Sequence, residues 1–337
     1  MKNIMLVIFY ILVILVIIGC LYSYFIYTNK KGYHDNNKIK LHNWWNLNDD
    51  EHYNTVTFFN DTMTVDTLKK YKEIHIFSVF GKPEFVKNPE NLYIQYSGES
   101  YYSDPSMFDI NLIPDEKYEK AMTNKRDAAK TTTVLFPHGY FTILSSNMNM
   151  NYFLQRRTLQ IPKTRFCLFC VSNGSNWVRN DFFEKLSKYK QVDSCGSFMN
   201  NMPNNERCPQ DPAEYMEYIS QYKFMICFEN KPQRNYLTEK LFNSYYAETI
   251  PIYWGCTNVS DYINMDSILY LKTEHSEKDM ENLIEDIILL DNDDEEYQRR
   301  YNCELFRGGV LPDEFNLEAI KVKINQLALH NATTTVS

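Results

Sequence analysis

Two basic residues lie in the first turns of two predicted helices, and each helix follows a strongly apolar segment. Arg179 comes soon after the apolar segment 166–171, and Lys240 comes soon after 222–228. A cation in the first turn gains nothing from the helix dipole, which favours anions at that end. A doubly charged anion between the two residues would explain both, because arginine grips phosphate oxygens bidentately and lysine acts as a point charge. The pair therefore predicts a diphosphate site.

More polar side chains follow the same two apolar segments, where an open α/β sheet binds its ligands, outside the carboxyl ends of its strands. Taken singly, either helix start is better explained as solvated surface, and Glu239 beside Lys240 as an exposed ion pair of little value. The repetition of the pattern favours a nucleotide or nucleotide-sugar site. Neither GxxxxGK[ST] nor GxGxxG occurs, which excludes a P-loop and a dinucleotide fold. The candidate site residues are Ser172, Asn173, Arg179, Asn230, Tyr236, Glu239 and Lys240.

The elements that must position these residues alternate between strands and helices. The chain has 337 residues, enough for about two domains. Strands alternating with helices imply right-handed βαβ units around parallel sheets, which is the α/β class. An irregular stretch ending near 161–162 predicts the crossing between the two domains. The strand-like segments are 73–80, 92–96, 108–112, 166–171, 222–228 and 250–254, and a last amphipathic helix is expected at 314–329.

Charge and cysteine content exclude several classes of protein. The formal net charge of −8 argues against a nucleic-acid binder, which needs a basic surface. Eight cysteines are too few for a disulfide-rich scaffold. Cys167 and Cys170 are followed by no second pair at zinc spacing, so buried thiols explain them better. The Asp291-Asn292-Asp293 triplet could mark a metal-dependent transferase, but it lies in an acidic run between helices and is better explained as a solvated turn.

The N-terminus carries an uncharged apolar segment, residues 4–27. A membrane span needs about 20 such residues, whereas the apolar region of a cleaved signal peptide has about 7–15. We therefore expect a retained signal-anchor. Lys2 precedes the segment, whereas Lys30, Lys31 and two further lysines follow it. By the positive-inside rule, these flanking lysines would place the body of the protein in the cytoplasm. They do not support a lumenal body, and the orientation stays open.

Several motifs resemble those of family 10 glycosyltransferases, the α1,3/4-fucosyltransferases. Residues 222–262, YKFMICFENKPQRNYLTEKLFNSYYAETIPIYWGCTNVSDY, are similar to the signature segment of the family in the order and spacing of FEN, Y-x-TEK and P-x-x-x-G. VSNGSNWVRNDFFEKLSKYKQVDSCG resembles an upstream stretch, with Cys195 where the family often has Gly. LYIQYSGESYYSDPSMFDINL and the pair Trp44-Trp45 resemble segments nearer the start, and bacterial members look most similar.

This resemblance implies a GT-B fold of two Rossmann-like domains with a cleft between them. It implies that Glu99 is the general base and that Ser172, Asn173, Arg179, Asn230, Tyr236, Glu239 and Lys240 contact GDP-fucose. It also implies inverting transfer of L-fucose from GDP-β-L-fucose to a glycan. Because two cations are expected at the diphosphate, we expect no metal to be needed for leaving-group stabilisation. Apart from the resemblance, Glu99 would be an ordinary loop carboxylate after the turn at Ser97-Gly98. The expected domains are an anchor at 1–28, a stem at 29–40, an acceptor-side domain at 41–160, a donor domain at 161–310 and a C-terminal helix and tail at 311–337.

Two alternatives remain open at the level of sequence. Another GDP- or UDP-sugar could be the donor of the same fold, or the chain could be a membrane-tethered glycan-binding protein without catalysis. Residues 113–151 do not follow the family pattern, so the acceptor is not defined. The resemblance fits a Golgi-type type II protein in a eukaryote or virus, whereas the lysine flanks fit a bacterial inner-membrane protein with a cytoplasmic body.

Overall fold

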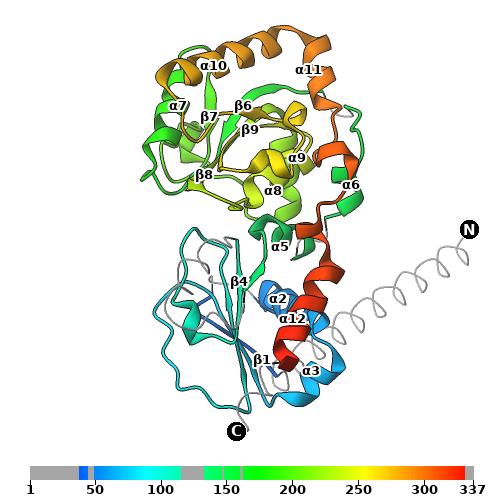
Figure 1. The fold of residues 1–337 in the computed structure, drawn as a ribbon. Helices are drawn as coiled ribbons and strands as arrows, with labels where there is room; N and C mark the ends of the chain where they lie inside the picture. Colours follow the sequence, from blue (N-terminus) through cyan, green and yellow to red (C-terminus); the bar gives the residue numbers. More distant parts are fainter. Residues whose placement is uncertain (1–37, 45–48, 115–132, 146–147, 160–161, 331–337) are drawn as a thin grey trace, which may run out of the picture.

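The computed structural model describes residues 38–44, 49–114, 133–145, 148–159 and 162–330, which form two α/β units joined through α5 and α6 (Figure 1). Each unit is built on a parallel sheet, with strand order β1-β2-β3-β4-β5 in the first and β10-β9-β8-β6-β7 in the second. The predicted α/β class with parallel sheets is confirmed.

The first unit places three strands close to the predicted positions. Its elements are β1 (Ile39–His42), α2 (Asp49–Thr62), α3 (Val65–Lys70), β2 (Ile74–Phe77), β3 (Leu92–Tyr96), β4 (Ile110–Ile113), β5 (Thr133–Leu135), α5 (His138–Ser145) and α6 (Met150–Leu154). β3 has the predicted bounds, whereas β4 begins later than predicted because Pro105–Met107 forms a 3-10 turn before it. β1 begins inside the segment expected to be a stem.

The second unit carries most of the candidate site. Its elements are β6 (Arg165–Phe169), α7 (Trp177–Ser187), β7 (Val192–Ser194), α8 (Pro212–Ser220), β8 (Tyr222–Gln233), α9 (Glu239–Tyr246), β9 (Ile250–Cys256), β10 (Leu269–Tyr270), α10 (Glu277–Asn292) and α11 (Asp294–Tyr301). Side chains on β8 alternate between two cores, as strand geometry requires. Phe224 and Ile226 pack toward α7 and α10, whereas Met225 and Cys227 pack toward α8 and α9.

The core on the α9 side is continuous with the core of the first unit. Phe59 of α2 and Ile94 of β3 belong to the same buried cluster as Phe242 of α9. The C-terminal helix α12 (Leu317–His330) crosses back to the first unit, where it lies beside α2 and α3 (Figure 1). There the buried Asn325 accepts hydrogen bonds from the Thr64 amide (2.8 Å) and the Thr67 hydroxyl (2.7 Å). α12 therefore ties the two units together.

The membrane anchor predicted at 4–27 lies outside the described residues and stays a prediction. Among the residues that the structure describes, none of the helices has the length and apolar character to span a membrane. The predicted domain boundary at 160/161 also falls on residues outside the described ranges.

Candidate active site

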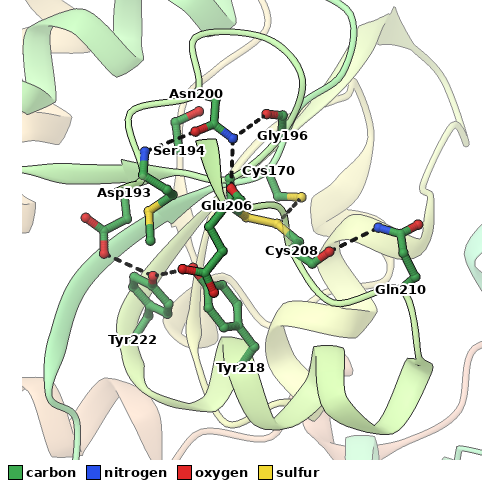
Figure 2. Close-up of a disulfide and its surroundings, with 12 residues drawn as sticks. Cys170, Asp193, Ser194, Gly196, Asn200, Glu206, Cys208, Gln210, Tyr218 and Tyr222 are labelled. Atoms are coloured by element: carbon green, nitrogen blue, oxygen red, sulfur yellow. Dashed lines mark hydrogen bonds between the residues drawn. A yellow bond between two sulfur atoms is a disulfide. The ribbon is translucent and has the colours of Figure 1, made fainter. Parts of the chain in front are cut away.

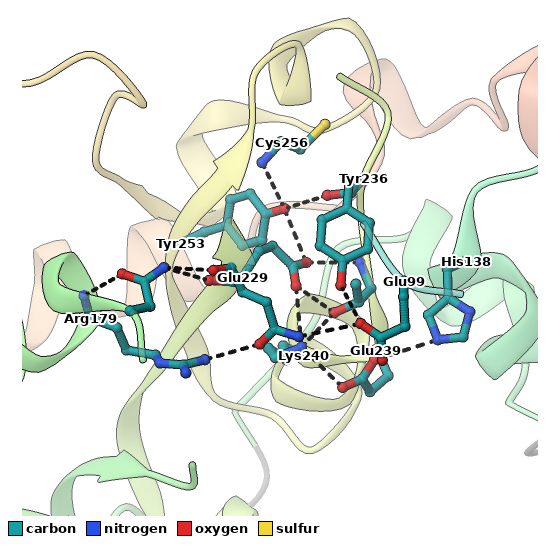
Figure 3. A network of polar contacts seen from close by, with 12 residues as sticks. Glu99, His138, Arg179, Glu229, Tyr236, Glu239, Lys240, Tyr253 and Cys256 are labelled. Carbon is teal, nitrogen blue, oxygen red and sulfur yellow. Dashed lines mark hydrogen bonds and ion pairs between the residues drawn. The ribbon is translucent and has the colours of Figure 1, made fainter. Parts of the chain in front are cut away.

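The candidate residues gather at the carboxyl ends of β3, β6 and β8, where the two units meet (Figure 3). This is the edge at which parallel sheets bind ligands. β8 stays paired with β9 up to Phe228, and the pairing then shifts register before resuming at Gln233. The irregular residues between them include Glu229 and Asn230, so the bulge releases both from the regular ladder into the site.

Arg179 is held at the start of α7 by that helix's own cap. Asn176 is the N-cap, and its side-chain oxygen accepts from the Arg179 amide at 3.2 Å. The Asn176 amide group also donates to the backbone oxygen of Asn230 (2.9 Å), which fixes α7 against β8. The Arg179 guanidinium is buried and donates to the Asn230 side chain at 3.3 Å and to the backbone oxygen of Asn173. Within the part of the chain that the structure describes, its Nε has no hydrogen-bond partner.

Glu229 lies at the centre of the part of the site that the second unit contributes, and none of its surface is exposed. One carboxylate oxygen accepts from the Thr238 amide (2.8 Å) and the Tyr253 hydroxyl (3.2 Å). The other accepts from the Thr238 hydroxyl (2.7 Å) and from Lys240 Nζ (3.2 Å). Burial raises the pKa of Glu229, and Lys240 and the Thr238 hydrogen bonds oppose that shift.

Lys240 lies between two carboxylates. Its Nζ is 3.2 Å from an oxygen of Glu229 and 3.2 Å from an oxygen of Glu239. Burial alone would lower the pKa of Lys240, but the two carboxylates outweigh it and raise the pKa. Burial likewise works against ionisation of Glu239, yet Lys240 and His138 hold its pKa at about 2. Both groups are therefore charged at neutral pH, and Lys240 is the counter-ion of two acids as well as a candidate diphosphate ligand.

Glu99 reaches this cluster from the first unit. It follows β3 in a loop fixed by Ser97, whose hydroxyl donates to the backbone oxygens of Glu99 (2.9 Å) and Tyr101 (2.8 Å). One Glu99 carboxylate oxygen accepts from Asn230 at 3.4 Å and from the Tyr236 hydroxyl at 3.3 Å. Burial raises the pKa of Glu99, Lys240 lowers it, and Glu239 raises it. Glu99 is thus a half-buried carboxylate of the first unit whose hydrogen-bond partners belong to the second unit.

His138, at the start of α5, is a second contribution from the first unit. Its Nδ1 lies 2.6 Å from the Tyr96 hydroxyl, and its Nε2 lies 3.8 Å from a Glu239 oxygen. Burial lowers the pKa of His138 to about 4, so the ring is neutral at neutral pH. Burial raises the pKa of Tyr96 well above its usual value. Tyr96 therefore donates to Nδ1, which leaves the ring proton on Nε2, on the Glu239 side.

The structure brings most of the predicted residues together. Ser172 and Asn173 are exposed on the loop after β6, and Asn173 contributes its backbone oxygen rather than its side chain to Arg179. Sequence reasoning missed Tyr253 and His138, and it gave no role to Glu229. For Glu229, an acid directly after an apolar strand and before Lys240 was an available signal. For Tyr253 and His138 no local signal exists, because their partners are distant in sequence.

The prediction that Asp291 lies in a solvated turn is wrong. Its side chain is only 3% exposed, and it pairs with Lys190 (2.9 Å) and Lys223 (3.2 Å). Asp291 lies in the last turn of α10, which packs against the sheet of the second unit. The two lysines therefore compensate the charge of its buried carboxylate. Asp293 caps α11, with its side chain accepting from two amides of the first turn. Structural roles therefore explain Asp291 and Asp293, whereas residues 292–295 are exposed.

Gly255 on β9 makes room for Glu229. Its φ is +138°, and a Cβ placed there would lie 2.5 Å from Glu229 Cβ. Gly308 also has a positive φ, +69°, but a Cβ there would meet nothing within 4 Å. We expect Gly255→Ala to lower the free energy of unfolding by about 1–3 kcal/mol more than Gly308→Ala, because only the first adds overpacking to backbone strain. Urea denaturation of both variants measures the difference, and equal losses would contradict the packing role of Gly255.

Residues 161–304 match the family model described as Glycosyltransferase family 10 (fucosyltransferase) C-term. The chain is 26% identical over 282 residues to the α-(1,3)-fucosyltransferase FucT of Helicobacter pylori, covering 72% of this chain and 58% of that protein. It is 28% identical over 250 residues to a predicted fucosyltransferase of Acanthamoeba polyphaga mimivirus, covering 72% of this chain and 38% of that protein.

The fold is shared with solved structures. A crystal structure of an α1,3-fucosyltransferase matches with a TM-score of 0.62 at 20% identity, covering 86% of this chain and 89% of the other. The same kind of enzyme crystallised with GDP-fucose matches with a TM-score of 0.53 at 20% identity and the same coverage. These two matches show that the chain shares the α/β fold of those structures. The family model and the two relatives show that the chain is similar to the family 10 fucosyltransferases, which confirms the resemblance seen in the sequence. It spans 38% and 58% of the length of the two relatives named above.

Proposed function

We propose that the chain is an inverting α1,3-fucosyltransferase that transfers L-fucose from GDP-β-L-fucose to a glycan. The observation that carries the proposal is the meeting of Glu99, from the first unit, with Asn230 and Tyr236 of the second. A carboxylate on one unit and paired cations on the other fit a reaction in which acceptor and donor arrive from opposite sides. The family match of residues 161–304 supports the donor assignment.

Inversion in one displacement needs a base for the acceptor hydroxyl. Glu99 accepts the proton while the acceptor oxygen bonds to the anomeric carbon and the bond to the diphosphate oxygen breaks. Its half-buried position and raised pKa suit a base that must work near neutral pH. The two hydrogen bonds from Asn230 and Tyr236 orient the carboxylate in the absence of substrate.

The departing diphosphate needs positive charge and fixed donors. Arg179 supplies a buried guanidinium and Lys240 an ammonium, each in the first turn of a helix whose free amides also favour an anion. Glu239 is assigned to the ribose hydroxyls, and Ser172, Asn173, Asn230 and Tyr236 complete the donor contacts. We propose that no metal is required, since these cations supply the charge that a metal would bring.

Donor turnover by the full chain tests the proposal. GDP-fucose, GDP-mannose, UDP-galactose and UDP-N-acetylglucosamine are each offered with an N-acetyllactosamine acceptor, with and without EDTA. We expect transfer from GDP-fucose alone, unaffected by EDTA. Hydrolysis of GDP-fucose without transfer would retain the donor and reject the acceptor. Turnover of another donor would reject the fucose assignment, and binding without turnover of any donor would point to a glycan-binding protein.

The pH dependence of kcat/KM tests the base. Glu99 must be deprotonated to act, so the rate falls as pH falls through its pKa, which burial places above the usual value near 4.5. Glu239, with a pKa of about 2, stays ionised across this limb. We expect Tyr236→Phe to move the acid limb to higher pH, because the lost hydrogen bond stabilised the Glu99 carboxylate. An acid limb that does not move would contradict the assignment of this limb to Glu99.

A further inference from the structure

Three cysteines from separate segments meet below the loop that follows β6. Cys195 and Cys208 form a disulfide, and Cys170 Sγ lies 2.8 Å from Cys208 Sγ (Figure 2). All three sulfur atoms lie within 4.8 Å of one another. Cys170 is a free thiol, so of the two sulfur atoms in this contact only Cys170 Sγ can carry a hydrogen. Neither the disulfide nor the cluster was predicted from the sequence, which indicated a buried thiol for Cys170.

We propose that Cys170, Cys195 and Cys208 form a thiol–disulfide exchange site in which Cys208 is shared between two partners. The Cys170 thiol loses its proton and attacks Cys208 Sγ. The Cys170–Cys208 bond forms as the Cys195–Cys208 bond breaks, and the electron pair leaves on Cys195 Sγ, which takes up a proton. One disulfide and one thiol are present before and after, so no oxidant or reductant is consumed.

Hydrogen bonds hold the loop between Cys195 and Cys208 in addition to its disulfide. The side chain of Asn200 donates to the backbone oxygens of Gly196 (3.0 Å) and Glu206 (2.9 Å), which closes the loop from inside (Figure 2). Cys208 N also donates to Cys195 O at 3.3 Å. Breaking the Cys195–Cys208 bond therefore leaves the sulfur atoms near one another, which is the condition for reversible exchange.

The alternative bond carries no entropic disadvantage. The Cys195–Cys208 bond closes a separation of 13 residues, whereas a Cys170–Cys208 bond closes 38. Cross-linking a longer loop restricts the unfolded chain more and so stabilises the fold more, in the chain-entropy account. Burial raises the pKa of the Cys170 thiol, which keeps the reactive thiolate scarce at neutral pH. We therefore expect exchange over minutes to hours.

The three-cysteine site lies beside the loop that follows β6, which carries Ser172 and Asn173. Cys195 N donates to Phe169 O at 3.2 Å, Phe198 N donates to Val171 O at 3.0 Å, and the Ser197 hydroxyl donates to Ser172 O at 3.3 Å. A Cβ on Gly196 would lie 1.9 Å from Val171 O, so the two segments are in direct backbone contact. The exchange therefore takes place beside the loop in which the backbone oxygen of Asn173 accepts a hydrogen bond from Arg179.

Disulfide mapping of the full chain tests the proposal without reference to the transferase activity. Protein purified without reductant is alkylated with iodoacetamide in the native state after increasing times, digested with trypsin without reduction and identified by mass spectrometry. Trypsin separates the three cysteines, because it cuts after Arg179 and Arg207. We expect alkylated thiol at Cys170 in some molecules and at Cys195 in others, with Cys208 always in a disulfide.

Single variants sharpen the test. Cys195→Ser should contain a Cys170–Cys208 disulfide, and Cys170→Ser should contain Cys195–Cys208 alone. Cys303→Ser, which removes a free thiol outside the cluster, is the control and should match the unchanged protein. Alkylation of Cys170 only, at every time, would overturn the proposal, as would free thiols at both Cys170 and Cys208 in Cys195→Ser. Purified protein that contains one equivalent of zinc, with Cys170, Cys195 and Cys208 all as free thiols, would also overturn the proposal, because it would indicate a metal site.

Discussion

Glu99→Gln should lower kcat for fucose transfer by about 10²–10⁴-fold, the usual contribution of a positioned general base. Glutamine has nearly the same shape, and its side-chain oxygen can still accept from Asn230 and Tyr236, so the contact between the two units should be preserved. What it lacks is the ability to take a proton at neutral pH. The affinity for GDP-fucose should therefore be largely unchanged, as isothermal titration measures.

A matched control comes from the same unit. Glu84 is an exposed carboxylate on the segment before β3, so Glu84→Gln removes an equal charge away from the site. It should leave kcat and GDP-fucose affinity as they are. Unchanged turnover in Glu99→Gln would remove Glu99 from the mechanism. Loss of donor affinity along with turnover would instead make Glu99 a structural link between the units.

The parts of the site that the sequence predicted are those set by local structure. Arg179 and Lys240 were placed in first turns after buried strands, and α7 and α9 begin where the apolar periodicity indicated. A helix start is a local event, because capping and periodicity involve residues a few positions apart. The same reasoning gave β3 its bounds, placed the ends of β6 to within two residues and gave the start of β8. β8 runs on to Gln233, beyond the predicted end at Phe228, because the strand continues past an irregular stretch that periodicity does not show.

The parts that it missed depend on contacts between distant residues. Glu99 meets Asn230 across 131 positions and Tyr236 across 137, so no window of sequence contains the pair. The burial of Glu229 follows from Gly255 on the neighbouring strand. Asp291 looked solvated because its acidic neighbours are, although its own side chain turns toward two lysines from other elements. Local pattern cannot distinguish a buried acid from an exposed one in such a run.

The two acids beside Lys240 change what the sequence suggested about that residue. From the sequence, the unusual position of a cation in a first turn called for an external anion. In the structure the chain itself supplies an anion for Lys240, because an oxygen of the fully buried Glu229 lies 3.2 Å from Lys240 Nζ. Lys240 can then serve the diphosphate, the internal acid or both, and a variant of Lys240 alone would not separate these roles.

Lys240→Met should lower the free energy of unfolding by about 3–5 kcal/mol, because it leaves the buried Glu229 carboxylate without its counter-ion. The loss should grow as pH rises. Without Lys240 the pKa of Glu229 in the folded chain, already raised by burial, rises further above its unfolded value. The carboxyl is then neutral at low pH and costs nothing, whereas ionising it at higher pH destabilises the fold. Urea denaturation at several pH values measures both effects, and a loss independent of pH would contradict them.

The double variant Lys240→Met with Glu229→Gln separates the two roles. It removes both charges together, so the free energy of unfolding should recover much of the loss, and Glu217→Gln, on the exposed face of α8, is the control that should restore nothing. GDP affinity is then measured on the stable double variant. Affinity that stays low shows that Lys240 contacts the diphosphate directly. Affinity that returns with stability shows that Lys240 acts only through Glu229, which leaves Arg179 as the cation that binds the leaving group.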